Sequence, residues 1–123
     1  MPSYGKSFGP SALTADTKSQ VGSDYTVPHS GVIKQIRYCF YQGVIDKATT
    51  GILYLESDRQ KGPFEFAVGG SIGITTTSGA TGPNAQTEVV EVDIPITQGE
   101  ILSVHVKAAE ALEEATISIT WLS

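Results

Sequence analysis

The chain has 123 residues and a net charge of −5, with 8 basic and 13 acidic side chains. This length fits one domain that buries about two-thirds of its unfolded surface. The acidic balance argues against nucleic acid and anionic membrane surfaces as partners, because both need clustered lysine and arginine. The single cysteine, Cys39, rules out a disulfide within the chain.

No run approaches the roughly 18 apolar residues of a membrane span, and the N-terminal residues lack the apolar core of a signal peptide. We therefore expect a protein that stays in the cytoplasm or leaves the cell inside a larger particle such as a virion.

Residues 1–26 differ in composition from the rest of the chain, being rich in serine, glycine, threonine and alanine. Such a segment buries too little apolar surface to offset its ordering entropy. We predict an extended or flexible arm at 1–26, ahead of a sandwich domain at 27–123. Its few apolar residues, Tyr4, Phe8 and Leu13, are the candidate anchors for contact with another subunit.

After this segment, runs with apolar residues at every second position predict short strands. The ranges are 32–41, 52–55, 64–68, 72–77, 87–96, 102–106 and 116–122, with a further short strand near residues 25–27. In the range 32–41 apolar residues occur at both parities, which predicts a bulge or burial on two sides.

The link between the two runs within 87–106 is Thr97–Glu100, which predicts either a paired hairpin or a turn into the next strand. Residues 108–114 have helical propensity but are too short for a stable helix, so we expect a single helical turn or a loop there. In the final strand Ile117, Ile119 and Trp121 share the inward parity, and Thr116, Ser118 and Thr120 point outward.

Seven or eight short strands without intervening helices predict an all-β, antiparallel β-sandwich, since parallel pairs need crossover helices. The spacing favours a single jelly roll of about eight strands, with an immunoglobulin-like sandwich as the alternative.

No motif for catalysis, a metal or a cofactor is present, so we expect a protein that is not an enzyme and binds no cofactor. The two histidines, His29 and His105, have no spaced cysteine or histidine partners for zinc. Cys39 is flanked by Tyr38 and Phe40, which predicts a buried, inert thiol.

A sugar site would need an exposed aromatic platform. Its candidates are Tyr41, Tyr54 and Trp121, although Trp121 shares the parity of core residues.

Two stretches resemble the terminal strands of small jelly-roll domains: 93–106 (DIPITQGEILSVHV) with 117–122 (ISITWL), and the opening 26–33 (TVPHSGVI). Such domains occur among virus and phage capsid, decoration and fibre proteins and among trimeric C1q/TNF-like modules. The sequence departs from the C1q/TNF-like modules in lacking their aromatic-rich inner strands and a secretion signal.

The resemblance, with the arm and the absence of chemistry, implies a virion capsid or decoration (cement) subunit. We expect it to self-associate as a trimer or ring and to contact neighbouring subunits of the particle, without nucleic acid or membrane as a partner. The alternative is a carbohydrate-binding module.

Overall fold

The computed structural model describes residues 2–42, 49–59, 64–72, 84–108 and 111–123. These ranges hold nine strands and no helix. The strands are β1 (Ser3–Leu13), β2 (Ser19–Gln20), β3 (Tyr25–Thr26), β4 (Gly31–Gln42), β5 (Thr49–Ser57), β6 (Phe64–Ile72), β7 (Asn84–Ile96), β8 (Ile101–Ala108) and β9 (Leu112–Leu122).

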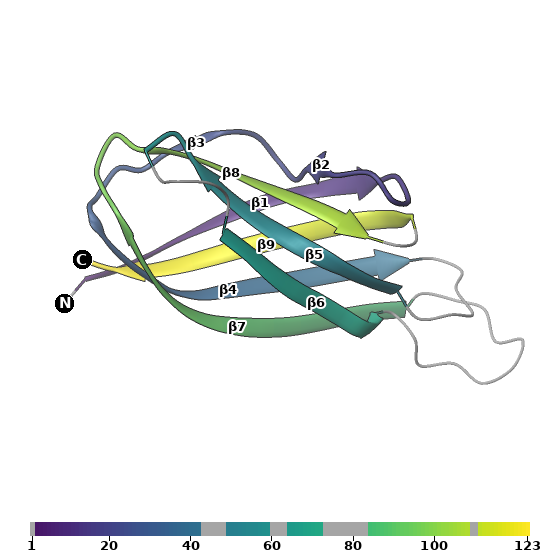
Figure 1. The fold of residues 1–123 in the computed structure, drawn as a ribbon. Helices are drawn as coiled ribbons and strands as arrows, with labels where there is room; N and C mark the ends of the chain where they lie inside the picture. The colour runs from purple at the N-terminus through teal and green to yellow at the C-terminus, as the bar shows by residue number, and fades with distance from the viewer. Residues whose placement is uncertain (1, 43–48, 60–63, 73–83, 109–110) are drawn as a thin grey trace, which may run out of the picture.

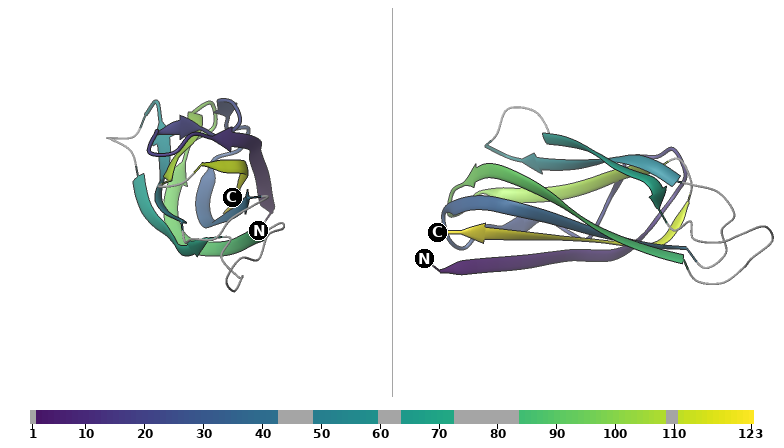
Figure 2. Two further views of the ribbon diagram at one scale, coloured as in Figure 1. Left: turned by 90° about the vertical axis from the view of Figure 1, so that its right-hand side faces the viewer. Right: turned by 90° about the horizontal axis from the view of Figure 1, so that it is seen from below.

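The strands form two layers (Figures 1 and 2). Sheet I has the order β1-β9-β4-β7, and sheet II has the order β2-β8-β5-β6, with β3 also paired to β8. Every pairing is antiparallel. The predicted all-β antiparallel sandwich is therefore confirmed.

The core lies between the two layers and follows the alternation of the strands. In β9 the residues Ile117, Ile119 and Trp121 are buried, as predicted, because every second side chain of this strand faces sheet II. The main buried partners from other strands are Phe8, Ile33, Ile36, Tyr38, Phe40, Leu53, Leu55, Leu102, Val104 and Val106.

The inward parity of β4 changes along the strand, as the mixed pattern predicted. Ile33 is buried, and the next inward residues are Ile36, Tyr38 and Phe40. The register to both neighbours shifts between Ile33 and Gln35, which places a β-bulge at Lys34. The bulge turns this lysine out of the core and explains why it interrupts an apolar run.

The structure does not confirm an arm at residues 1–26. β1 is a full edge strand of sheet I and pairs with β9 from Ser3↔Leu122 to Leu13↔Leu112. Phe8 and Leu13 are only 1% and 4% exposed. The segment is ordered by pairing within its own chain, which supplies the backbone hydrogen bonds that its composition could not predict. The two ends of the chain consequently lie side by side (Figure 1), and Ser123 N donates to Pro2 O at 3.2 Å.

The helical turn or loop expected at 108–114 is corrected at both ends of this range, which belong to strands. β8 continues to Ala108 and β9 begins at Leu112, and both Ala108 and Ala115 are buried. Cross-strand pairing with Gly51 holds Ala108 in the ladder. Burial in a sheet thus outweighs the weak helical propensity of a short segment.

Two further expectations are decided by the topology. β7 lies in sheet I and β8 in sheet II, so Thr97–Glu100 is a turn into the next strand and not a hairpin. β6 runs from Phe64 to Ile72 and so extends the predicted strand 64–68, with a shift of its register to β5 between Val68 and Ile72. The remainder of the predicted strand at 72–77 lies outside the described residues.

Candidate interaction face

The outward face of sheet I is formed by the residues that alternate with the core residues along its strands. Register places them in rows across the sheet. One row is Ser7, Ser118, Arg37 and Val89, and the adjacent row is Gly5, Thr120, Gln35 and Glu91.

Around Ser118 the β1–β9 half of this face is small and uncharged. Its side chains are the hydroxyls of Ser7, Ser118, Thr116 and Thr120, with Gly5 beside them. Oγ of Ser7 and Oγ of Ser118 lie 2.9 Å apart and share a hydrogen bond across the strands. Short side chains in regular rows leave a flat surface with few rotamers to immobilise.

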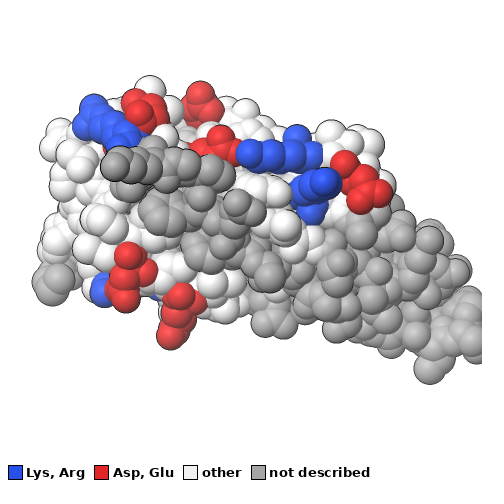
Figure 3. All heavy atoms as spheres, viewed as in Figure 1, with Lys and Arg blue, Asp and Glu red and all other residues white. Residues whose placement is uncertain are grey.

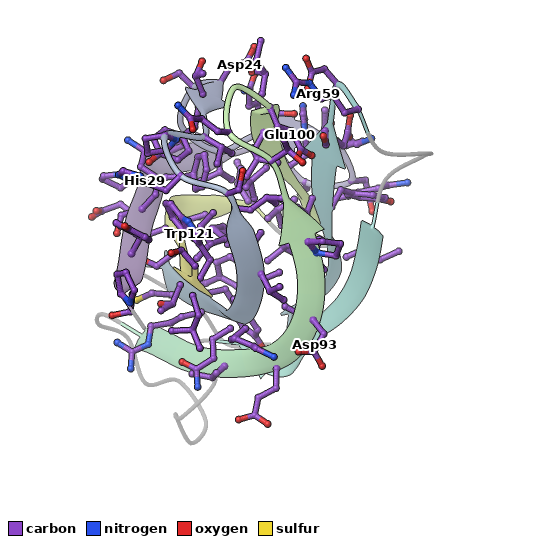
Figure 4. The ribbon with its side chains drawn as sticks, turned by 90° about the vertical axis from the view of Figure 1, so that its left-hand side faces the viewer. Asp24, His29, Arg59, Asp93, Glu100 and Trp121 are labelled. Atoms are coloured by element: carbon purple, nitrogen blue, oxygen red, sulfur yellow. The ribbon has the colours of Figure 1, made fainter. Side chains whose placement is uncertain are left out.

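Among the side chains that the structure describes, charge on this face lies on its β4–β7 half and at one end of β9. Lys34 Nζ and Asp93 Oδ1 form an ion pair at 2.5 Å, and Asp93 projects from β7 away from the sandwich (Figure 4). Arg37, Glu91 and Glu114 are exposed. Among the described residues none of these three has an ion-pair partner within the chain.

The outward face of sheet II differs from the β1–β9 half of sheet I in carrying charge at its centre. Lys18 Nζ lies 2.5 Å from Glu56 Oε2, and its ammonium is 4.4 Å from the centre of the Tyr54 ring. His105 Nδ1 is 3.4 Å from the same glutamate oxygen. Figure 3 looks onto this face and shows basic (blue) and acidic (red) side chains close together along its upper part.

The pKa of Glu56 lies below its ordinary value, chiefly because the Lys18 ammonium hydrogen-bonds to the carboxylate. The charges of His105 and Lys18 act in the same direction, against the opposing effect of desolvation. The Lys18 and Glu56 charges are thus paired within the chain, whereas His105 Nδ1 is buried beside them without a hydrogen-bond partner among the described residues.

Two shallow hollows are present on the described surface. One, of about 280 Å³, is lined by Lys34, Gln35, Glu91, Val92 and Asp93 at the β4 bulge. The other, of about 130 Å³, lies at the flank of β1, where Lys6 Nζ sits 5.1 Å from the centre of the Tyr25 ring.

The described part of the chain contains no group of three or more histidine, cysteine or acidic side chains that could hold a metal. It also contains no helix long and apolar enough to cross a membrane. The sequence predicted neither enzyme nor cofactor, and these expectations remain predictions.

The three expected anchors of the arm make their contacts inside the chain. Phe8 and Leu13 belong to the core, so neither offers a surface to a second subunit. The Tyr4 ring stacks on His29, with ring centres 4.3 Å apart, and its centre is 5.5 Å from that of Trp121. Their assignment as subunit anchors is therefore corrected: they fasten β1 to its own sandwich.

The expected sugar platform is not assembled by the described residues. Trp121 is 1% exposed, and its Nε1–H donates to the carbonyl oxygen of His29 at 3.0 Å; Figure 4 shows both residues at the same end of the sandwich. Tyr54 lies under the Lys18 ammonium. The side chain of Tyr41 lies outside the described residues.

Cys39 departs from its predicted burial and is only partly buried. Tyr38 and Phe40 take the inward positions on either side of it, so alternation turns the thiol to the outward face of sheet I.

The positions of the residues that distinguish the two outward faces could only partly be predicted from the sequence. The outward parity of Thr116, Ser118 and Thr120 was predicted correctly. Arg37 and Glu91 were not singled out, because their adjacency depends on which strands are neighbours.

No protein-family model matches the chain, and no curated protein matches it either. Among solved structures, the chain is similar to the structure of Eiger TNF from S. frugiperda. The TM-score is 0.55 at 13% identity, over 100% of this chain and 94% of that chain. This likeness shows the fold alone. The fold is a jelly roll.

Aromatic side chains line the core of this jelly roll: Phe8, Tyr38, Phe40 and Trp121 are all buried between the sheets. They come from three different strands, so along the linear sequence the inner face looks poor in aromatic residues.

Proposed function

We propose that the protein is a non-enzymatic assembly subunit that self-associates through the outward face of sheet I. The type we favour is a virion capsid or decoration subunit that forms a trimer or ring. The observation that carries the proposal is the contrast between the two outward faces. The β1–β9 half of sheet I presents small neutral side chains around Ser118, whereas the centre of sheet II presents the ion pair of Lys18 with Glu56.

Covering the part of the sheet I face around Ser118 costs little free energy, because the side chains there are short and uncharged and few rotamers are lost. Val89, which is 43% exposed at the β7 edge of the same face, adds apolar area. Covering the centre of the sheet II face would instead remove the Lys18 ammonium and the partly exposed Glu56 carboxylate further from water, which is costly for charged groups. Depletion of charge at the centre of a face is the compositional signature of protein interfaces.

The arm plays no part in this proposal, since β1 is a strand of the sandwich and itself contributes Gly5 and Ser7 to the face. We therefore assign the contact with another subunit to the flat outward surface of sheet I and not to an arm.

The test is the solution mass of the full chain by multi-angle light scattering across a concentration series. Wild type is expected to be an oligomer, and Ser118→Arg is expected to be a monomer, because a long cation in the middle row prevents close contact. Ser103→Arg is the matched control, since Ser103 occupies an equivalent outward and partly buried position on sheet II.

A monomeric wild type would overturn the proposal. An oligomer that withstands Ser118→Arg but dissociates with Ser103→Arg would move assembly to the other face and also contradict it. Circular dichroism of both variants verifies that the sandwich is intact.

A further inference from the structure

We infer that Arg37 of one copy forms an ion pair with Glu91 of a neighbouring copy when two sheet I faces meet. This inference rests on the proposed function and names the polar contact that would set the register between copies. The partner is thus a second copy of this chain.

The positions of the two residues come from the strand register. Arg37 lies between Ser118 of β9 and Val89 of β7. Glu91 lies opposite Gln35, one row along the sheet. The two charges are therefore diagonal neighbours, a separation that long side chains can span.

Despite this proximity, no ion pair joins Arg37 and Glu91 within the chain. Among the described residues both are exposed and both lack a charged partner. Nearby Lys34 and Asp93 are already paired with each other at 2.5 Å. The outward face of sheet I thus holds one unpaired cation and one unpaired anion in adjacent rows.

When a second copy covers the outward face of sheet I, the Arg37 guanidinium needs an anionic partner. Arg37 sits on an inner strand of sheet I, so a second copy that covers the small-residue half also takes this guanidinium out of water. An unpaired buried charge costs far more than a paired one. The contact must therefore supply a carboxylate, and a guanidinium and a carboxylate form directional, charge-assisted hydrogen bonds.

Glu91 is the carboxylate best placed to supply it. Glu114, the other unpaired acid of the face, lies opposite Tyr41, four residues along β4 from Arg37 and at the end of β9. Because Arg37 and Glu91 adjoin, a two-fold contact centred between them forms two pairs at once. A ring contact forms one pair at each interface.

The experiment is a charge exchange followed by light scattering and sedimentation velocity. Arg37→Glu and Glu91→Arg are each expected to raise the dissociation constant of the oligomer by about 10-fold or more. The double variant, with both substitutions, is expected to restore assembly to within a few-fold of wild type. Glu114→Arg is the matched control, because it makes the same charge change on the same face.

The outcomes separate the two proposals. If Ser118→Arg dissociates the oligomer while Arg37→Glu and Glu91→Arg behave like Glu114→Arg, the pairing is overturned and self-association through sheet I stands. If both single variants dissociate but the double variant does not recover, the two charges act separately and the pairing is overturned. A monomeric wild type overturns both proposals. Recovery in the double variant alone supports the pair.

Discussion

Oε1 of Glu100 lies 2.8 Å from the backbone nitrogen of Thr97 and accepts its hydrogen bond. The carboxylate is 1% exposed, and its second oxygen accepts from the hydroxyl of Ser57 at the end of β5. The turn from sheet I to sheet II is therefore closed by a buried side chain that also contacts the second layer. Figure 4 shows Glu100 at this end of the sandwich, with Arg59 nearby.

Replacing this carboxylate is expected to lower the free energy of unfolding. Glu100→Ala leaves the Thr97 amide and the Ser57 hydroxyl without their acceptor, at a cost of about 1–3 kcal/mol. Glu100→Gln should cost less, because its amide oxygen can serve Thr97 and its NH₂ can donate to the Ser57 hydroxyl. Urea unfolding followed by tryptophan fluorescence measures both variants.

The exposed Glu114→Ala variant is the control and should leave unfolding unchanged. Equal losses for Glu100→Ala and Glu100→Gln would show that the negative charge, and not the two acceptor positions, stabilises the turn.

Phe8→Ala is expected to reduce the stability of the single chain and not merely its assembly. The ring is 1% exposed in the core and meets the Tyr25 ring edge-on at 6.1 Å between centres. Loss of a buried phenylalanine costs about 3–5 kcal/mol. The urea midpoint of a dilute sample should fall accordingly, while Ser3→Ala, at an exposed position of the same strand, should not shift it.

Deletion of residues 2–13 extends this prediction, because it removes β1 and exposes the edge of β9. The shortened chain should lose its cooperative unfolding transition. A deletion variant that stays folded, but as a monomer, would restore the role of residues 1–26 as an arm for subunit contact.

Gly31→Ala is expected to destabilise the sandwich where β4 begins. A Cβ at Gly31 would overlap the carbonyl oxygen of Leu122 and lie 2.8 Å from its carbonyl carbon. The backbone at the end of β9 cannot move aside without disturbing the neighbouring pairs, so the cost should be about 1–3 kcal/mol.

Gly5→Ala makes the same chemical change on β1, where the new Cβ meets Ile119 O at an ordinary 3.6 Å. This control should be neutral or slightly stabilising, because alanine restricts the unfolded chain. Similar thermal midpoints for the two variants would contradict the close approach at Gly31.

The period-two pattern was sufficient for the strands and for most of the core. Trp121 could be placed inward from its spacing to Ile117 and Ile119, because every second residue of a strand lies on the same face of the sheet. The bulge at Lys34 could be anticipated from the mixed parity of its strand, although not its location.

What the sequence could not reveal depends on pairing between distant segments. Residues 3–13 have too few apolar side chains to predict a strand, and only their hydrogen bonds to β9 order them. Arg37 and Glu91 are 54 residues apart in the chain and become neighbours only when β4 pairs with β7. A surface site that spans several strands is therefore hidden until the register is known.

The ion pair between Lys18 and Glu56 should make a small, pH-dependent contribution to stability. The pKa of Glu56 is lowered in the folded chain, mainly by the Lys18 ammonium. A lowered folded-state pKa stabilises the fold above the unfolded pKa, and this stabilisation is lost as the pH falls through the folded pKa. Because both side chains are partly exposed, 40% for Lys18 and 33% for Glu56, the contribution should be about 0.5 kcal/mol.

Glu56→Gln tests this contribution through urea unfolding at neutral pH and again well below the carboxyl pKa. The variant should be less stable than wild type at neutral pH and equal to it in acid, since the wild-type carboxyl is then also uncharged. Glu114→Gln, on an acid without an ion-pair partner among the described residues, should show no difference at either pH. A deficit of Glu56→Gln that persists in acid would mean that the loss of stability does not come from the Glu56 charge.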